Sequence, residues 1–184
     1  MGFLNRLVVM TVGKTHSGKT TFALALEKDM LNSIVIDQDN HAVFLHTYYE
    51  KLIPQQGHNT IKYLLTQTIV NHAINDTDCH IILSNSNRNR TGRLKLLKPY
   101  KDKNFTSVIV NFDIPEYVLQ ERVTKSQRST SILRTVTTFE EVLTRQQNEE
   151  ALAPTLDEVD HLFIVKNANE IPSVIREIIK IAHS

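Results

Sequence analysis

Apolar residues along the chain fall into five short runs of strand length, separated by longer stretches in which they recur at helical spacing. The five runs are residues 7–12, 33–36, 80–83, 107–110 and 161–165. The closing stretch is the clearest amphipathic helix, with Ile171, Val174, Ile175, Ile178 and Ile179 on one face. Strands that alternate with helices pair in parallel and carry helices on both faces of the sheet. The pattern therefore predicts an α/β fold, a three-layer α/β/α sandwich around a five-stranded parallel sheet.

Length and composition indicate one domain over residues 1–184, large enough for a single substantial core. The 21 Lys and Arg residues balance 20 Asp and Glu residues, so any basic patch for nucleic acid must be local. The single cysteine, Cys79, suits a reducing cytoplasm. Because the apolar runs are only strand-sized, we expect no membrane span, no signal peptide and no membrane partner. The expected location is therefore cytoplasmic, while the oligomeric state is left open.

A glycine-containing segment, Gly13-Lys14-Thr15-His16-Ser17-Gly18-Lys19-Thr20, lies between the first strand and a helix and has the form of a P-loop. Its glycines let the backbone turn its N–H groups inward, and the helix N-terminus adds partial positive charge toward the same anion. We expect Lys19 to reach the β- and γ-phosphates of ATP and Thr20 to offer its hydroxyl to Mg²⁺. His16 fills a variable position, where its backbone N–H does the binding. Residues 13–20 and Thr21 are thus the predicted nucleotide contacts.

Polar residues follow the second strand, where the carboxyl ends of parallel strands form the ligand crevice of an open α/β sheet. If the first two strands are neighbours, Asp39 and Lys19 open on the same crevice. Asp37 or Asn40 is the preferred cap of the next helix, expected over residues 41–52, which leaves Asp39 as the candidate base. Asp37 and Asp39 are also predicted acceptor contacts. The alternative is that these residues serve only as helix caps.

The strand at residues 80–83 ends in a polar and basic segment with no aspartate at its tip. Asn85 and Arg88 are the predicted substrate contacts there. Arg88, Arg90 and Arg93 could contact phosphate or substrate, or simply be the solvated start of a helix. These three arginines are the one indication of a basic track for nucleic acid.

A polar, basic and weakly periodic segment, residues 125–137, connects two helices and is predicted to be a lid. Arg122, Arg128 and Arg134 would supply positive charge around a transferring phosphoryl group. A lid also excludes water and suppresses plain ATP hydrolysis, which favours a kinase over an ATPase. The alternative is an ordinary solvated connection.

Residues 7–146 resemble the small P-loop kinases that include polynucleotide 5′-hydroxyl kinase and zeta-toxin, gluconate and adenylylsulfate kinases. The resemblance lies in the P-loop, in Ile36-Asp37-Gln38-Asp39, in Ile81-Ile82-Leu83-Ser84-Asn85-Ser86-Asn87, and in Val110-Asn111-Phe112-Asp113-Ile114-Pro115 followed by Arg122. It implies that Lys19 and Thr20 bind phosphate and Mg²⁺, that Asp39 is the base for the acceptor, and that Arg122 and Arg128 act with the lid. The chain has Ala42 where the family often has arginine, and Asn85 where the polynucleotide kinases have aspartate. These departures allow a different acceptor.

Three classes of function therefore stay open at the level of sequence. The first is a kinase that uses ATP and Mg²⁺ to phosphorylate a hydroxyl on a small molecule or on the 5′ end of a nucleic acid. The second is a nucleotide-binding switch or ATPase module that works through a partner. The third is a nucleic-acid-directed protein, which would need a basic track near the strand tips. GTP in place of ATP also fits the sequence, because no motif identifies the base.

Overall fold

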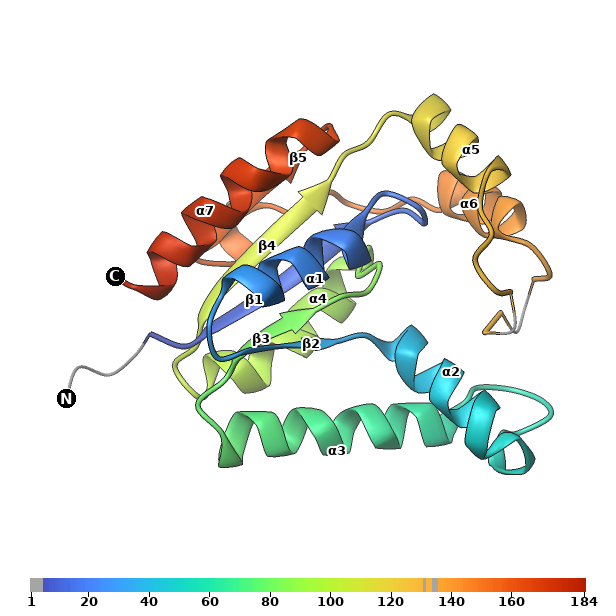
Figure 1. Cartoon of the computed structure of the whole chain (residues 1–184), viewed down its shortest axis with the longest axis horizontal. Helices are drawn as coiled ribbons and strands as arrows, with labels where there is room; N and C mark the ends of the chain where they lie inside the picture. Colours follow the sequence, from blue (N-terminus) through green and yellow to red (C-terminus); the bar gives the residue numbers. More distant parts are fainter. Residues whose placement is uncertain (1–4, 131, 134–135) are drawn as a thin grey trace.

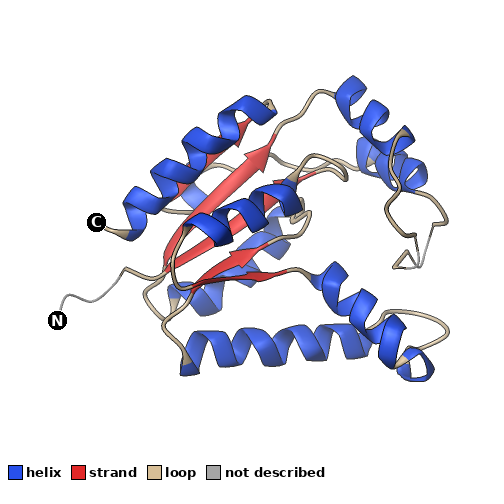
Figure 2. Ribbon diagram, in the orientation of Figure 1, coloured by secondary structure: helices blue, strands red, loops and turns tan. Residues whose placement is uncertain are grey.

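The computed structural model describes residues 5–130, 132–133 and 136–184, which form a single five-stranded sheet surrounded by helices. Every strand pair in the sheet is parallel, as Figure 2 shows and as the alternating pattern predicts. The strands are β1 (Leu7–Gly13), β2 (Ser33–Ile36), β3 (His80–Leu83), β4 (Thr106–Phe112) and β5 (His161–Val165).

Seven α-helices connect and cover the strands in the described part of the chain (Figure 1). They are α1 (Lys19–Asp29), α2 (Gln38–Tyr48), α3 (Thr60–Asp76), α4 (Arg90–Lys101), α5 (Glu116–Thr124), α6 (Phe139–Asn148) and α7 (Ile171–Ala182). Three short 3₁₀ turns lie at Glu50–Leu52, Leu156–Glu158 and Ala168–Glu170. None of the helices that the structure describes is long and apolar enough to cross a membrane.

The strands separate two apolar layers because successive side chains of a strand point to opposite faces. On β1, Leu7 and Val9 pack in the layer that contains α1 and α7, whereas Val8 and Met10 pack in the layer that contains α3 and α4. All four side chains are fully buried. The three-layer α/β/α sandwich predicted from the sequence is thus confirmed. Helices α5 and α6 extend the first layer beyond the carboxyl end of the sheet (Figure 1).

The strand order is β2-β3-β1-β4-β5, so the first two strands of the chain are not neighbours. Strand β3 lies between them, with Ile82 paired to Val9 on one side and to Val35 on the other. The condition stated in the sequence analysis, that the first two strands are neighbours, is therefore not met. Their ends still meet, because Thr20 in the first turn of α1 donates to Asp37, the residue that follows β2, at 3.4 Å.

The P-loop requires glycine at two positions, Gly13 and Gly18, and the reason differs between them. A Cβ atom on Gly13 would lie 2.9 Å from the Cβ of Phe112 and 2.9 Å from the Oγ of Ser17, so no larger residue fits without a shift of the chain. Gly18 has a φ of 100° and is the N-cap of α1, a left-handed conformation that side chains disfavour. Together these positions fix the loop against β4 and aim the N-terminus of α1 into the crevice.

Candidate active site

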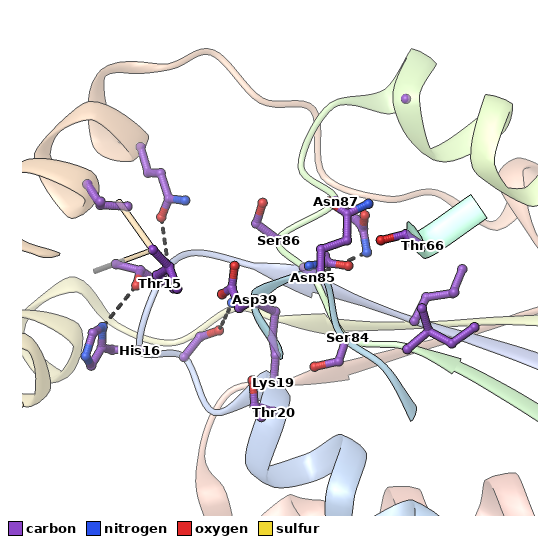
Figure 3. A pocket seen from close by; sticks show the side chains of 18 of the residues that line it. Thr15, His16, Lys19, Thr20, Asp39, Thr66, Ser84, Asn85, Ser86 and Asn87 are labelled. Atoms are coloured by element: carbon purple, nitrogen blue, oxygen red, sulfur yellow. Dashed lines mark hydrogen bonds between the residues drawn. The ribbon is translucent and has the colours of Figure 1, made fainter. Parts of the chain in front are cut away.

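A cavity of about 1390 Å³ lies at the carboxyl end of the sheet and contains most of the predicted site residues (Figure 3). One wall is the P-loop with the first turn of α1, and a second wall is the segment after β3. The start of α2, one side of α3 and α4, and the lid with α6 complete the lining. The predicted residues that line it are Thr15, His16, Ser17, Gly18, Lys19, Thr20, Thr21, Asp39, Asn85, Arg122 and Arg128.

The P-loop presents free backbone donors to this cavity. In the described part of the chain, no N–H group from His16 to Thr21 donates a hydrogen bond, and the first bonded amide of α1 is that of Phe22, on the carbonyl of Gly18. Unpaired N–H groups at a helix N-terminus are the ordinary ligands of a phosphate. The loop therefore fits a polyphosphate chain.

Lys19 is folded back on the P-loop. Its Nζ donates to the carbonyl of Lys14 at 2.5 Å and to the Oγ of Ser17 at 3.2 Å. Burial and the nearby positive charge of Arg128 together lower the pKa of Lys19 to about 8. The side chain of Lys14 turns away from the cavity and forms an ion pair with Glu116 at 2.6 Å. A phosphate in the loop would offer Lys19 a better partner than a neutral carbonyl.

Two oxygen-bearing side chains, Thr20 and Asp37, meet beside the first turn of α1. The hydroxyl of Thr20 donates to Asp37 Oδ2 at 3.4 Å, while Asp37 Oδ1 accepts from the amide of Asp39 and so caps α2. Asp37 is 3% exposed, and burial raises the pKa of its carboxyl group. The cap that the sequence assigned to Asp37 or Asn40 is confirmed for Asp37. Because this cap acts at Asp37, α2 begins at Gln38, three residues earlier than expected.

Ser84 supplies a further hydroxyl group at this end of the sheet, at the tip of β3. It is 3% exposed, and its Oγ is the one buried side-chain polar atom in the described chain without a hydrogen-bond partner. It follows Leu83, the partner of Ile36 in the sheet, so Ser84 and Asp37 occupy corresponding positions at the tips of β3 and β2. Figure 3 shows Ser84 on the side of the cavity where Lys19 and Thr20 lie. Hydroxyl and carboxylate oxygens are ligands that Mg²⁺ or its bound waters prefer, and an unsatisfied hydroxyl fits such a site.

Asp39 and the lid arginine Arg128 form an ion pair. Asp39 lies in the first turn of α2, and its Oδ2 accepts from Arg128 Nη2 at 2.6 Å. The two side chains are 42% and 40% exposed, so both remain accessible from the cavity. The guanidinium of Arg128 also lies 5.1 Å from the ring centre of Phe139 at the start of α6. The structure thus brings Asp39, Arg128 and the P-loop to one cavity.

The side chain of His16 joins the P-loop to the lid, a role that the sequence did not indicate. Its Nε2 lies 2.8 Å from the Oγ of Ser126, and its ring packs edge-on against Phe139 at 5.0 Å. Arg122, which is on α5, donates a hydrogen bond of 3.1 Å to the carbonyl of His16. Burial lowers the pKa of His16, and the nearby charge of Arg128 lowers it further. No sequence motif marks this contact, since Ser126 is one of several polar residues in the lid.

Gln146 on α6 is a second contact missed in the sequence. Its Oε1 accepts from the backbone N–H of Thr15 at 2.7 Å, which holds the P-loop against α6. Arg88 lies next to it, donating to the carbonyl of Gln146 at 2.5 Å and to Glu149 at 3.0 Å. Arg88 does not line the main cavity, and its role as a substrate contact stays a prediction. Asn85 does line the cavity.

The other two arginines of the predicted basic track point to carboxylates within the fold. Arg93 is fully buried, and its Nε and Nη2 donate to the two carboxylate oxygens of Glu158 at 2.8 Å each. Arg90 donates to Asp157 at 2.6 Å. Arg93 therefore fits neither alternative given by the sequence, because its enclosed guanidinium is neither solvated nor open to a phosphate, and Arg90 is already paired. Arg134 lies outside the described residues, as do two further positions of the lid.

Comparison with known proteins rests on structure alone, since no protein-family model matches the sequence and no curated protein matches it significantly. A sugar kinase from Janibacter sp. superimposes with a TM-score of 0.62 at 18% identity, covering 95% of this chain and 93% of that one. The APS kinase of Mycobacterium tuberculosis, in complex with AMPPNP and APS, gives a TM-score of 0.60 at 16% identity over 98% and 99%. The chain has the fold of the small P-loop kinases. Kti12 from Chaetomium thermophilum, in complex with ADP-AlF3, shares this P-loop kinase fold with a TM-score of 0.61 at 14% identity over 93% and 96%.

Proposed function

We propose that the chain is a phosphotransferase that moves the γ-phosphoryl group of ATP to a hydroxyl group of an acceptor. The observation that carries this proposal is the position of Asp39 in the same cavity as the unpaired P-loop N–H groups. A carboxylate facing a phosphate site can accept the proton of an attacking alcohol, which plain nucleotide binding does not require. The fold shared with several kinases supports the same conclusion.

In this proposal the triphosphate lies on the N–H groups of residues 16–21, and Lys19 leaves the carbonyl of Lys14 to contact it. The adenine would lie against apolar residues of the cavity lining, among them Ile114 and Ile171. This placement suits a flat aromatic base, since small-molecule sites are mostly apolar with a few polar groups that fix orientation. The AMPPNP and ADP-AlF3 complexes of proteins with this fold support an adenine nucleotide.

Mg²⁺ fits beside Thr20. The Thr20 hydroxyl and the Asp37 carboxylate would hold the ion or its waters, and the unpartnered Ser84 hydroxyl would accept from one such water. When bound, the ion supplies neutralisation of the negative charge on the phosphate oxygens. The remaining contributions come from the chain itself.

Asp39 would take the proton of the acceptor hydroxyl on a carboxylate oxygen, once Arg128 has moved from that carboxylate toward the phosphates. Arg128 and Arg122 would then face the spreading negative charge of the phosphoryl group. The lid, attached to the P-loop through His16 and Ser126, would exclude water and so favour transfer over hydrolysis.

Acceptor-dependent formation of ADP by the purified chain tests the proposal. The acceptors are nucleosides, sugars, hydroxy acids, aminoglycosides and oligonucleotides with a 5′ hydroxyl, each with ATP and Mg²⁺. We expect at least one class to stimulate ADP release and to become phosphorylated in equal amount. ATP binding without stimulation by any class would count against a kinase.

A nucleotide-dependent module that acts through a partner is the second candidate. The similarity in fold to Kti12 bound to ADP-AlF3 favours it, because that similarity is as close as the similarity to the kinases. The two candidates differ at Asp39, which a kinase needs for proton transfer and a binding module does not.

A further inference from the structure

Positive charge is concentrated around the cavity although the chain as a whole is nearly neutral, with 21 basic and 20 acidic residues. Among the described lining residues, Asp39 is the one carboxylate. The cations in the same lining are Lys19, Lys62, Lys95, Arg122, Arg128 and Arg145. A cavity with this excess attracts anions and repels cations.

Four of these six cations contact the P-loop or pair with a carboxylate. Lys19 and Arg122 contact the P-loop, Arg128 pairs with Asp39, and Arg145 lies 3.5 Å from Glu149. Lys62 and Lys95 remain. Neither ammonium group forms an ion pair or a hydrogen bond within the described chain, and that of Lys62 lies 5.1 Å from the ring centre of the neighbouring Tyr63.

Lys62 and Lys95 lie on the walls of the cavity away from the phosphate loop. Lys62 is in the first turn of α3 and Lys95 is on α4, and both helices border the cavity on the side of Asn85 and Ser86. The charge of Lys62 reaches α2, because it adds to the burial that lowers the pKa of His41, two residues after Asp39. A molecule held between these walls would therefore present its hydroxyl to Asp39 while its own charge faces the lysines.

We infer that the acceptor is an anionic alcohol, whose carboxylate or phosphate group is bound by Lys62 and Lys95. The inference rests on the proposed function and adds the chemical class of its substrate. Bound ATP with Mg²⁺ would engage Lys19, Arg122 and Arg128, which leaves the half-buried Lys62 and the exposed Lys95 as the cations available to an anionic acceptor. Lysine is a compact point charge on a flexible stem, and it accommodates a carboxylate or a phosphate equally.

Two neutral polar side chains of the cavity lining, Asn85 and Ser86, suit the uncharged part of such an acceptor. The side chains of Asn85 and Ser86 line the cavity and form no hydrogen bond within the described residues. Figure 3 shows both next to Asn87, on the segment that follows β3. An amide and a hydroxyl without internal partners are available to the hydroxyl groups of an acceptor.

The test compares matched pairs of acceptors that differ in charge: gluconate with glucose, glycerate with glycerol, and nucleoside 3′-monophosphates with nucleosides. A short single-stranded oligonucleotide with a 5′ hydroxyl shows whether the anion belongs to a small molecule or to a nucleic acid backbone. We expect kcat/KM for the anionic member of the productive pair to exceed that of the neutral member by about tenfold or more.

Lys62→Ala and Lys95→Ala should each raise the KM for that anionic acceptor about tenfold, with kcat and the KM for ATP changed by less than about twofold. Lys98→Ala is the matched control, because Lys98 is on α4 but pairs with Asp102 and does not line the cavity. It should leave all three constants unchanged. Far-ultraviolet circular dichroism checks that each variant is folded.

Two results would overturn the inference while leaving the proposed function intact: preferred phosphorylation of a neutral or cationic acceptor, or an anionic acceptor whose KM is insensitive to both lysine variants. Phosphorylation of no acceptor at all, with ATP bound, would remove the proposed function and the inference with it. Activity on the oligonucleotide alone would support an anion in the lysine site and assign it to a nucleic acid backbone.

Discussion

Arg128 Nη2 lies 2.6 Å from Asp39 Oδ2, so the lid arginine occupies the carboxylate that the proposed reaction needs as a base. The same arginine lies close enough to Lys19 for its charge to lower the pKa of Lys19, so it is near both the base and the phosphate loop. A polyphosphate on the loop would compete with Asp39 for Arg128. Nucleotide binding would then free the base, so that lid, nucleotide and acceptor site are linked through one side chain.

Replacing Arg128 should therefore reduce catalysis more than folding. For Arg128→Ala we expect kcat to fall about 100-fold, because a charge that stabilises the transferring phosphoryl group is lost. Arg128→Lys should recover part of this loss. Steady-state kinetics measure the effect, with Lys125→Ala as control, since Lys125 pairs with Glu121 in the same segment. Equal kcat in Arg128→Ala and Lys125→Ala would contradict a role for Arg128 in transfer.

The pKa of Lys19 predicts a pH dependence of nucleotide binding. Burial lowers this pKa to about 8, so the free chain loses the positive charge of Lys19 as the pH rises through that value. The Kd for ATP should accordingly increase between about pH 7.5 and pH 9.5. Isothermal titration calorimetry over this range measures it. Lys19→Arg keeps its charge and should show no such increase, whereas a parallel rise in both proteins would assign the titration to another group.

Ser84→Ala should weaken the response to Mg²⁺ and leave metal-free nucleotide binding unchanged. The unpartnered Oγ is placed to accept from a metal-bound water, and loss of such outer contacts typically lowers metal affinity about tenfold or more. The measurement is the Mg²⁺ concentration for half-maximal ATP affinity, beside ATP affinity in EDTA. Ser86→Ala, on the same segment but exposed, is the control. An altered acceptor KM with unchanged Mg²⁺ response would place Ser84 against the acceptor instead.

The Arg93–Glu158 pair should be a determinant of stability and not of activity. Both side chains are fully buried, so removing either one leaves an uncompensated charge. We expect Glu158→Gln or Arg93→Met to lower the free energy of unfolding by about 3–5 kcal/mol in urea titrations. The combined Arg93→Met and Glu158→Leu variant should recover part of this loss. Single variants with unchanged stability, or with nucleotide affinity reduced at native stability, would contradict the assignment.

Features governed by local sequence could be predicted well. The helix face Phe139, Val142, Leu143 and Gln146, inferred from spacing, matches the four buried positions of α6. β5 has the bounds expected from its apolar run, His161–Val165. The P-loop also needed no distant information, because its glycines, its lysine and the helix that follows are contiguous in the chain.

Features governed by contacts between distant residues could not be predicted. The insertion of β3 between β1 and β2 depends on which strands pair, and one apolar run resembles another. The hydrogen bond from Thr15 to Gln146 joins positions 131 residues apart, and Arg93 and Glu158 are 65 residues apart. Nothing near Arg93 in the sequence distinguishes a buried cation from a phosphate ligand. The residues that line the cavity were therefore more predictable than the contacts that hold them in place.

Turnover of Asp39→Asn is the most direct test of the central claim that this carboxylate takes a proton from an acceptor alcohol. With the acceptor identified by the panel, we predict that kcat falls at least about 100-fold while the Kd for ATP changes by less than about threefold. Gln38→Ala, at the adjacent position in the cavity lining, should keep most of the activity. Acceptor phosphorylation by Asp39→Asn at a rate close to that of the native chain would contradict the account.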